Sequence, residues 1–223
     1  MQLVTIPNFD QIRLDSGSHP DRSNGLCVME LSAWLAGENH TDRPECVSPV
    51  IAAFMRRWND DLDDEGRQKL KPYAQKVIGT KGSPEDEEKR AWLATDWMVR
   101  VHTPAWLELA GLDLQAAALR GLPEITSSSV AVAAQPAIDD AKRASSMAWD
   151  AAWDAAWDAA WDAAWAAAWD AAWAAARDAA WAAARDAARD AVDKKLHPTK
   201  VSLQQSAFEL LDRMVSISEK EAA

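Results

Sequence analysis

The chain has 223 residues, a formal net charge of −11, two cysteines and thirteen tryptophans. This length can form one medium domain with an extension, or two small domains. Binding to a nucleic-acid backbone or to an anionic membrane normally needs a basic surface, so the acidic balance argues against both partners.

Signals for secretion or membrane insertion are missing from the sequence. The first residues, Met1 to Pro7, lack a charged segment and a long apolar core, and no run of about 18 uncharged apolar residues occurs. We therefore expect a cytoplasmic protein in which Cys27 and Cys46 stay reduced.

Helix start and stop signals follow one another through the first half of the chain. Ser48-Pro49, Ser83-Pro84 and Thr103-Pro104 each place an N-cap hydroxyl before a proline at the first helical position. The predicted helices cover about 25–36, 49–62, 64–78, 84–102, 104–111 and a last stretch up to 121. The third of them should bend or break around Pro72. Residues 1–121 are therefore predicted to form a compact helical domain.

The second half is predicted to contain a linker and two further helices. Residues 122–136, with three consecutive serines and alternating Val and Ala, predict the linker. Residues 137–197 hold neither Gly nor Pro and would form a helix about 90 Å long if unbroken. Pro198 is expected to end it, and 198–223 to form a returning amphipathic helix. The fold class is all-α, and the sequence leaves open whether the long helix is continuous or folds into a hairpin.

A four-residue repeat of Trp, Asp and Ala fills residues 148–191. Its key position holds eight of the thirteen tryptophans and, towards the end, three arginines. The key residues are Trp149, Trp153, Trp157, Trp161, Trp165, Trp169, Trp173, Arg177, Trp181, Arg185 and Arg189. Asp follows the key residue in eight repeats, so the tract contributes a net charge of −5.

The period of the repeat decides where these positions lie on a helix. Four residues turn an α-helix by about 400°, which is about 40° more than one full turn. The tryptophan row therefore winds around the helix as a right-handed spiral. Because each Trp carries roughly 150–250 Å² of surface, eight exposed tryptophans would form an apolar patch far larger than soluble monomers tolerate.

Three arrangements could cover this spiral. A second copy of the chain could wrap it, which would make the protein a homo-oligomer. Alternatively, the helix could break into a hairpin or lie across the N-terminal domain, so that the tryptophans form a core. In the third arrangement Trp and Arg residues form a groove for a host protein or a small anionic ligand. Arg177, Arg185 and Arg189 would then contact the anion beside Trp173 and Trp181.

One group of residues in the first half has metal-binding side chains. Cys27 and Glu30 lie three residues apart on one predicted helix, and His40 and Cys46 lie on the following loop. Cys, His and carboxylate side chains can ligate zinc in a four-coordinate site. The spacing matches no standard zinc finger, however, and the alternative interpretation is a buried Cys27 with a loop held by His40 and Asp42.

Two short segments embed polar groups among large aromatic residues. They are Trp58-Asn59-Asp60 and Asp96-Trp97 with Arg100. Each can be a hydrogen-bond network that links helices, or part of a binding pocket. The four histidines are too scattered to indicate a nucleophile with its base, and Gly79 to Ser83 lacks P-loop spacing. No catalytic residue is therefore predicted.

Several short motifs within residues 24–121 resemble a group of uncharacterised helical proteins of tailed bacteriophages and bacteria. They include Cys27 to Glu30, Ala36 to Glu38, Cys46 to Pro49, Trp58 to Asp60, Ile78 to Thr80 and Pro104 to Leu107. The repeat similarly resembles alanine-rich helices of phage proteins. A phage context implies a host-directed inhibitor or a sequestering protein in the bacterial cytoplasm.

Together these patterns predict a non-enzymatic helical interaction protein that self-associates or docks a partner through the Trp spiral. The alternative is a metal-dependent enzyme or a small-ligand-binding protein that uses the region of Cys27, Glu30, His40 and Cys46.

Overall fold

The computed structural model describes residues 3–167 and 174–219; over 149–167, 174–193 and 218–219 it describes the helical backbone only. Every element in these described ranges is helical, which confirms the all-α prediction. Contacts group the chain into two compact units, Met1–Ala94 with Glu209–Ala223 (unit 1) and Thr95–Phe208 (unit 2). Across the described helices, none is both long and apolar enough to span a membrane.

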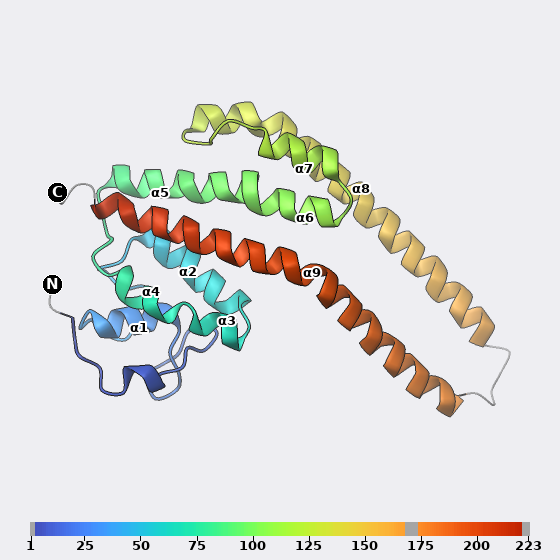
Figure 1. The fold of residues 1–223 in the computed structure, drawn as a ribbon, viewed down its shortest axis with the longest axis horizontal. Helices are drawn as coiled ribbons and strands as arrows, with labels where there is room; N and C mark the ends of the chain where they lie inside the picture. The colour runs from blue at the N-terminus through green and yellow to red at the C-terminus, as the bar shows by residue number, and fades with distance from the viewer. Residues whose placement is uncertain (1–2, 168–173, 220–223) are drawn as a thin grey trace. The chain divides into compact units, whose positions relative to one another are not determined.

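Unit 1 consists mainly of short helices joined by polar loops (Figure 1). Its elements are the 3-10 turn η1 (Phe9–Gln11), α1 (Val28–Leu35), α2 (Pro49–Asp61), α3 (Asp64–Gln68), α4 (Lys71–Lys76), the first part of α5 (Pro84–Trp97) and the last part of α9 (Ala174–Glu219). The helix α1 packs against both α2 and α4. Nearly all of its residues are buried, so α1 is the central helix of this unit.

Two of the three predicted start signals, Ser48 and Ser83, act as caps in the folded chain. The third does not, because Thr103 is itself the first residue of α6 and continues the π-helix before it. Ser48 accepts a hydrogen bond from the backbone N–H of Ile51 at the start of α2. Asp63 caps α3 in the same way through the N–H of Gly66. Pro72 lies in the first turn of α4, where its missing N–H removes no helical bond. The predicted break around Pro72 is thus the boundary between α3 and α4.

The last part of α9 completes the apolar core of unit 1. Its Leu210, Leu211 and Met214 are almost fully buried, as are Met29 and Leu31 of α1. Burial of a side chain of this size contributes about 1.5–3 kcal/mol. Residues from opposite ends of the sequence therefore supply one core.

A fully buried arginine links three helices of unit 1. Arg90 in α5 donates from Nε to the backbone carbonyl of Met214 at 3.1 Å, and its Nη1 contacts Glu87 Oε1 at 2.7 Å. Glu87 in turn accepts a hydrogen bond from the Ser48 hydroxyl at the start of α2. The guanidinium thus connects α5 to α9 directly and to α2 through Glu87.

Unit 2 combines short helices with parts of two long ones (Figure 1). Its elements are the end of α5, the π-helix η2 (Met98–His102), α6 (Thr103–Leu109), α7 (Asp113–Arg120), α8 (Ser128–Ala167) and the first part of α9. α7 packs against both α6 and α8. The core cluster is Leu107, Ala116, Leu119 and Ala141, with Val99, Leu112, Leu122, Ala137 and Ile138 against it.

Two of the sequence-based element bounds need correction, and the first is the linker predicted over 122–136. Residues 128–136 form the first turns of α8 instead. Ser127 caps the helix, because its hydroxyl accepts a hydrogen bond from the N–H of Val130. Pro136 lies inside the helix, where proline costs about 3 kcal/mol relative to Ala. The high helix propensity of the surrounding alanines and the burial of two of them outweigh that cost.

The second correction concerns the helix end predicted at His197-Pro198. α9 continues through both residues to Glu219. Pro198 lacks an N–H and so leaves the carbonyl of Lys194 without its usual helical partner. The buried side chains that follow in α9 hold the chain helical despite this lost bond.

The third point concerns residues 137–197, for which the sequence leaves a continuous helix and a hairpin open. With 40 residues α8 is about 60 Å long, and its first turns pack against α7. Residues 195–202 of α9 border a cleft with α6. A straight helix could not return to the α6–α7 pair, so the repeat is divided between two helices. The sequence also predicts that independently folding parts of the chain end at residues 121 and 136. These limits stay predictions.

We expect Arg90→Ala to destabilise unit 1 by about 3–5 kcal/mol, because Glu87 then loses its buried partner. Lys89→Ala is the matched control, since Lys89 is largely exposed and pairs with Asp86. Asp86 also binds the backbone N–H of Ser83, and the Lys89 ammonium is exposed to solvent, so this change should cost less than about 1 kcal/mol. Urea unfolding of both variants measures the difference, and equal losses would contradict a stabilising role for the buried guanidinium.

Candidate functional site

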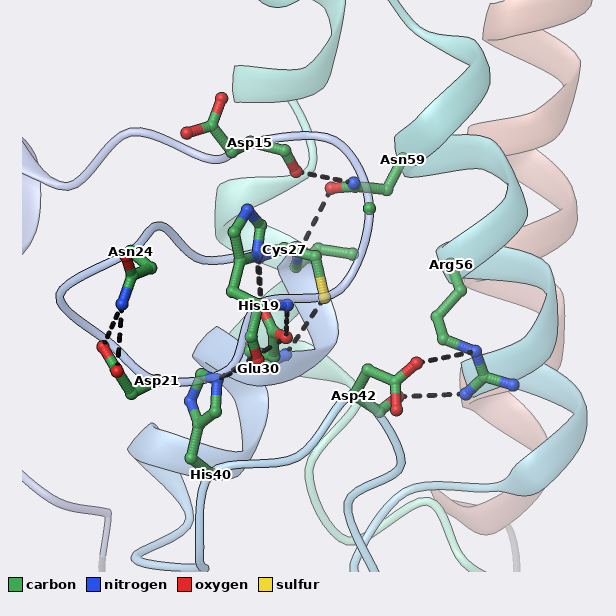
Figure 2. Close-up of polar contacts among 12 residues, drawn as sticks. Asp15, His19, Asp21, Asn24, Cys27, Glu30, His40, Asp42, Arg56 and Asn59 are labelled. Atoms are coloured by element: carbon green, nitrogen blue, oxygen red, sulfur yellow. Dashed lines mark hydrogen bonds and ion pairs between the residues drawn. The ribbon is translucent and has the colours of Figure 1, made fainter.

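A buried carboxylate organises the polar residues around the start of α1 (Figure 2). Glu30 is only 1% exposed and lies in the first turn of the helix. Its Oε1 accepts a hydrogen bond from the backbone N–H of His19 at 2.7 Å. Its Oε2 accepts from the backbone N–H of Cys27 at 2.7 Å and contacts His19 Nδ1 at 2.8 Å. Three donors therefore fix the loop before α1 to the helix start.

Cys27 and Glu30 form a capping box in which Cys takes the place usually held by Ser or Thr. The Cys27 sulfur accepts the Glu30 N–H at 3.5 Å, and the Glu30 carboxylate accepts the Cys27 N–H. Gly25 allows the His19 ring to approach this point. A Cβ at Gly25 would lie 2.7 Å from the ring, and the φ of +119° also favours glycine.

The electrostatics of Glu30 favour a fixed negative charge. Burial raises the pKa of Glu30, but the hydrogen bonds from the backbone of His19 and Cys27 and from the His19 side chain lower it to below its ordinary value. Glu30 is therefore ionised at neutral pH. A carboxylate that already accepts three hydrogen bonds and holds its proton weakly is poorly suited to act as a general acid.

His40 and Asp42 hold the loop that follows α1. His40 Nε2 donates to the backbone carbonyl of His19 at 2.9 Å, so in the neutral ring Nδ1 is the unprotonated nitrogen. This Nδ1 is buried and makes no hydrogen bond to any described residue. Asp42 contacts Arg56 of α2 through its backbone carbonyl and its carboxylate. These contacts match the alternative interpretation of this region, a loop held by His40 and Asp42.

The four predicted zinc ligands do not form one ligand group. Burial raises the pKa of Cys27 to about 12, so in the metal-free protein this thiol is protonated. Burial, followed by the Glu38 carboxylate beside it, raises the pKa of Cys46 to about 11. In the part of the chain that the structure describes, no three His, Cys, Asp or Glu side chains are positioned to hold a metal ion. A zinc site at Cys27, Glu30, His40 and Cys46 stays a prediction that these contacts do not support.

The predicted segment Trp58-Asn59-Asp60 links elements of unit 1. Asn59 is fully buried; its Oδ1 accepts the N–H of Val28 at 3.2 Å and its Nδ2 donates to the carbonyl of Asp15 at 2.8 Å. Asp60 accepts the N–H of Gly17 at 2.7 Å. Trp58 is half-buried and its ring lies 5.6 Å from that of Phe54. The network joins the N-terminal loop and the start of α1 to the end of α2.

The other predicted segment belongs to unit 2. Asp96 is buried and accepts hydrogen bonds from the backbone N–H of Ile125 at 2.8 Å and from Arg100 Nη1 at 3.0 Å. Trp97 Nε1 donates to the Ser206 hydroxyl of α9 at 3.0 Å. These three residues therefore join α5 and η2 to the segment before α8 and to α9. The two predicted segments lie in different compact units.

An aromatic cluster surrounds the π-helix of unit 2. The ring of His102 lies 5.1 Å from that of Trp97 and 6.2 Å from that of Trp106. The indole Nε1 of Trp106 donates to His102 Nε2 at 3.2 Å, which requires that nitrogen to be unprotonated. Burial lowers the pKa of His102 and favours the same neutral form. A π-turn is often found at functional sites, and Trp106 is 37% exposed here.

The side chains of the repeat lie outside the described residues. Trp149, Trp153, Trp157, Trp161 and Trp165 fall on the described backbone of α8, and Arg177, Trp181, Arg185 and Arg189 on that of α9. Trp169 and Trp173 lie in the segment between them, which is not described. The helical state of the repeat in α8 and α9 agrees with its sequence pattern.

A cleft of about 680 Å³ in unit 2 was not predicted from the sequence. Its lining residues are Ala105, Glu108, Leu109, Ala110, Gly111, Arg120, Lys195, Pro198, Thr199 and Ser202. The cleft residues that belong to α9 recur at the three- and four-residue spacing of one helix face, which is a signal that the sequence contains. It was missed because these residues directly follow the repeat, where the helix was predicted to end. The role of His19 was also missed, because it lies in a loop with no periodic signal.

No protein-family model matches the chain, and comparisons with curated proteins and with solved structures found no significant match. The resemblance of residues 24–121 to phage and bacterial helical proteins therefore stays an expectation. A function has to be argued from the residues themselves.

We expect Glu30→Gln to destabilise the protein by about 3 kcal/mol at neutral pH, because the amide has one acceptor oxygen for three donors. The lowered pKa means that the stabilisation by Glu30 is complete above its unfolded pKa of about 4.3 and is lost as the pH falls through the folded value. The difference in the free energy of unfolding between wild type and variant should therefore shrink below about pH 4.

Urea unfolding between pH 3 and pH 7 measures this difference, and the exposed Glu45→Gln serves as control. A pH-independent difference would contradict the assignment.

Both thiols are expected to react more slowly than a free cysteine, because their raised pKa values leave little thiolate at pH 8. Cys27 should react more slowly than the half-buried Cys46. Alkylation by iodoacetamide, followed by mass spectrometry with and without urea, measures both rates. Reaction of native Cys27 as fast as in urea would show that the thiol is activated.

Proposed function

We propose that the protein is a helical, non-enzymatic interaction protein that associates with a second copy of itself, or docks a partner protein, through the Trp/Asp repeat. The observation that carries this proposal is the helical state of the repeat, in which α8 extends through 149–167 and α9 through 174–193. In a phage context the same surface would make the protein a host-directed inhibitor or a sequestering protein.

The spread of the tryptophan positions around α8 supports an intermolecular cover. Trp149 to Trp165 are four repeats apart, and each repeat advances the position by about 40°, so together they span about 160° of the circumference. A helix that faces one neighbour typically buries an apolar stripe of roughly 100°. One neighbouring helix of the same chain is therefore too narrow to cover this row.

The way in which the two long helices are anchored also supports the proposal. Ala134 and Ala141 of α8 and Leu203 and Ala207 of α9 are buried in unit 2, and all four lie outside the repeat. The anchoring stripes contain small and aliphatic residues. Both long helices are therefore attached to unit 2 by residues that lie beside the repeat.

The chemistry around Cys27 gives less support to the alternative functions. The raised pKa values of Cys27 and Cys46 disfavour thiolate chemistry, and Glu30 is held by three donors. A binding role through the repeat accounts for the most unusual feature of the sequence, whereas a zinc site would need these contacts to be broken.

We expect the triple change Trp157→Ala, Trp161→Ala and Trp165→Ala to weaken association by about 4 kcal/mol or more, about a thousandfold in Kd, because buried tryptophans dominate such interfaces. Unit 1 should stay folded. Sedimentation velocity gives the mass, and circular dichroism with urea unfolding gives the fold. Trp106→Ala is the control, since it removes a partly exposed tryptophan outside the repeat.

Two outcomes would contradict the proposal. A wild-type chain that is monomeric at all concentrations, and that no partner protein joins, would exclude an interaction role for the repeat. Global unfolding of the triple variant would show that the tryptophans form an internal core.

A further inference from the structure

The cleft in unit 2 has two walls of different character. One wall is a stripe of α9 in which Lys195, Pro198, Thr199 and Ser202 follow one another at helical spacing. The other wall is formed by the end of α6 and the turn after it, with Arg120 of α7 at its edge. The volume of about 680 Å³ lies in the range of about 300–1,000 Å³ that is usual for binding sites.

We propose that this cleft receives Trp–Asp steps of the repeat from a second copy of the chain. The inference rests on the proposed function and names the surface that the repeat contacts. It follows from the shape of the cleft, from its charge and from its place beside the end of the repeat.

The shape of the cleft suits a large flat side chain. Ala105, Ala110 and Gly111 leave space on the α6 wall, and a Cβ at Gly111 would meet no atom within 4 Å. Leu109 and Pro198 add apolar surface. An indole also needs an acceptor for its N–H when it is buried. The hydroxyl groups of Thr199 and Ser202, which line the cleft, can accept such a hydrogen bond.

The charge of the cleft suits the aspartates that accompany the tryptophans. Arg120 is paired with Glu108 through both carboxylate oxygens, so the two charges compensate each other. The ammonium group of Lys195 is then the net charge of the cleft, and Thr199 and Ser202 add hydroxyl donors. The repeat carries a net charge of −5 over residues 148–191. The two surfaces are therefore complementary in sign.

The position of the cleft allows two copies to bind each other reciprocally. Lys195 follows the last residue of the repeat, Ala191, by one helical turn. When the α9 helices of two copies align antiparallel, the repeat residues of one α9 that are farthest from its own cleft come close to the cleft of the other copy. Every copy carries both the repeat and the cleft, so a two-fold arrangement satisfies both sites at once.

Charge reversal at two adjacent lysines tests this inference. Lys195 lines the cleft and Lys194 does not, but both are exposed on α9 and either change alters the net charge equally. We expect Lys195→Glu to raise the Kd of self-association about tenfold, and Lys194→Glu to raise it less than about threefold. Sedimentation velocity at low and high salt measures both, and the difference should narrow as salt screens the charges.

A second pair of variants tests the shape. Ser202→Trp fills the cleft, whereas Val201→Trp places the same side chain on the neighbouring exposed position outside it. Only the first should weaken association, and urea unfolding confirms that both variants fold. If the wild type associates and both pairs behave alike, the cleft is not the receptor, while the proposed role of the repeat stands. A monomeric wild type would overturn both.

Discussion

Helix α9 supplies buried side chains to two separate cores, and the rest of the fold depends on this sharing. Leu203 and Ala207 are buried in unit 2, and Leu210, Leu211 and Met214 are buried in unit 1. Arg90 strengthens the second attachment, because its guanidinium binds a backbone carbonyl of the same helix. The helix stays continuous through Pro198 because both groups of buried residues lie C-terminal to this proline.

The polar residues of unit 1 serve to hold this framework together. Glu30 binds the loop that carries His19, Asn59 binds the start of α1 and the N-terminal loop, and Arg90 binds α9. Each is buried and each bridges segments that are distant in sequence. These networks explain why polar groups lie among large aromatic residues, a pattern that is also typical of a binding pocket. The repeat is therefore the best candidate for a binding surface.

The parts of the fold that could be predicted are those encoded by neighbouring residues. Ser48-Pro49 and Ser83-Pro84 mark helix starts because a cap and its helix are adjacent. Pro136 and Pro198 were misread, because the burial that outweighs each proline comes from residues elsewhere in the fold. The same reason explains why the sequence leaves two interpretations of Cys27 and Glu30 open, a zinc site and a buried residue beside a fixed loop. Their actual partner, His19, stands eleven residues before Glu30 in a loop without periodicity. The cleft arises only once α6 and α9 meet, so no sequence window contains it.

The order of the segments along the chain has a consequence for how the protein is made. Residues 1–94 leave the ribosome first, but the side chains of α9 that complete their core leave it after the whole repeat has been translated. A nascent chain therefore presents an unfinished core and a growing row of tryptophans at the same time. On a polysome, where several such chains lie close together, the proposed association of the repeats would compete with aggregation before either chain has folded.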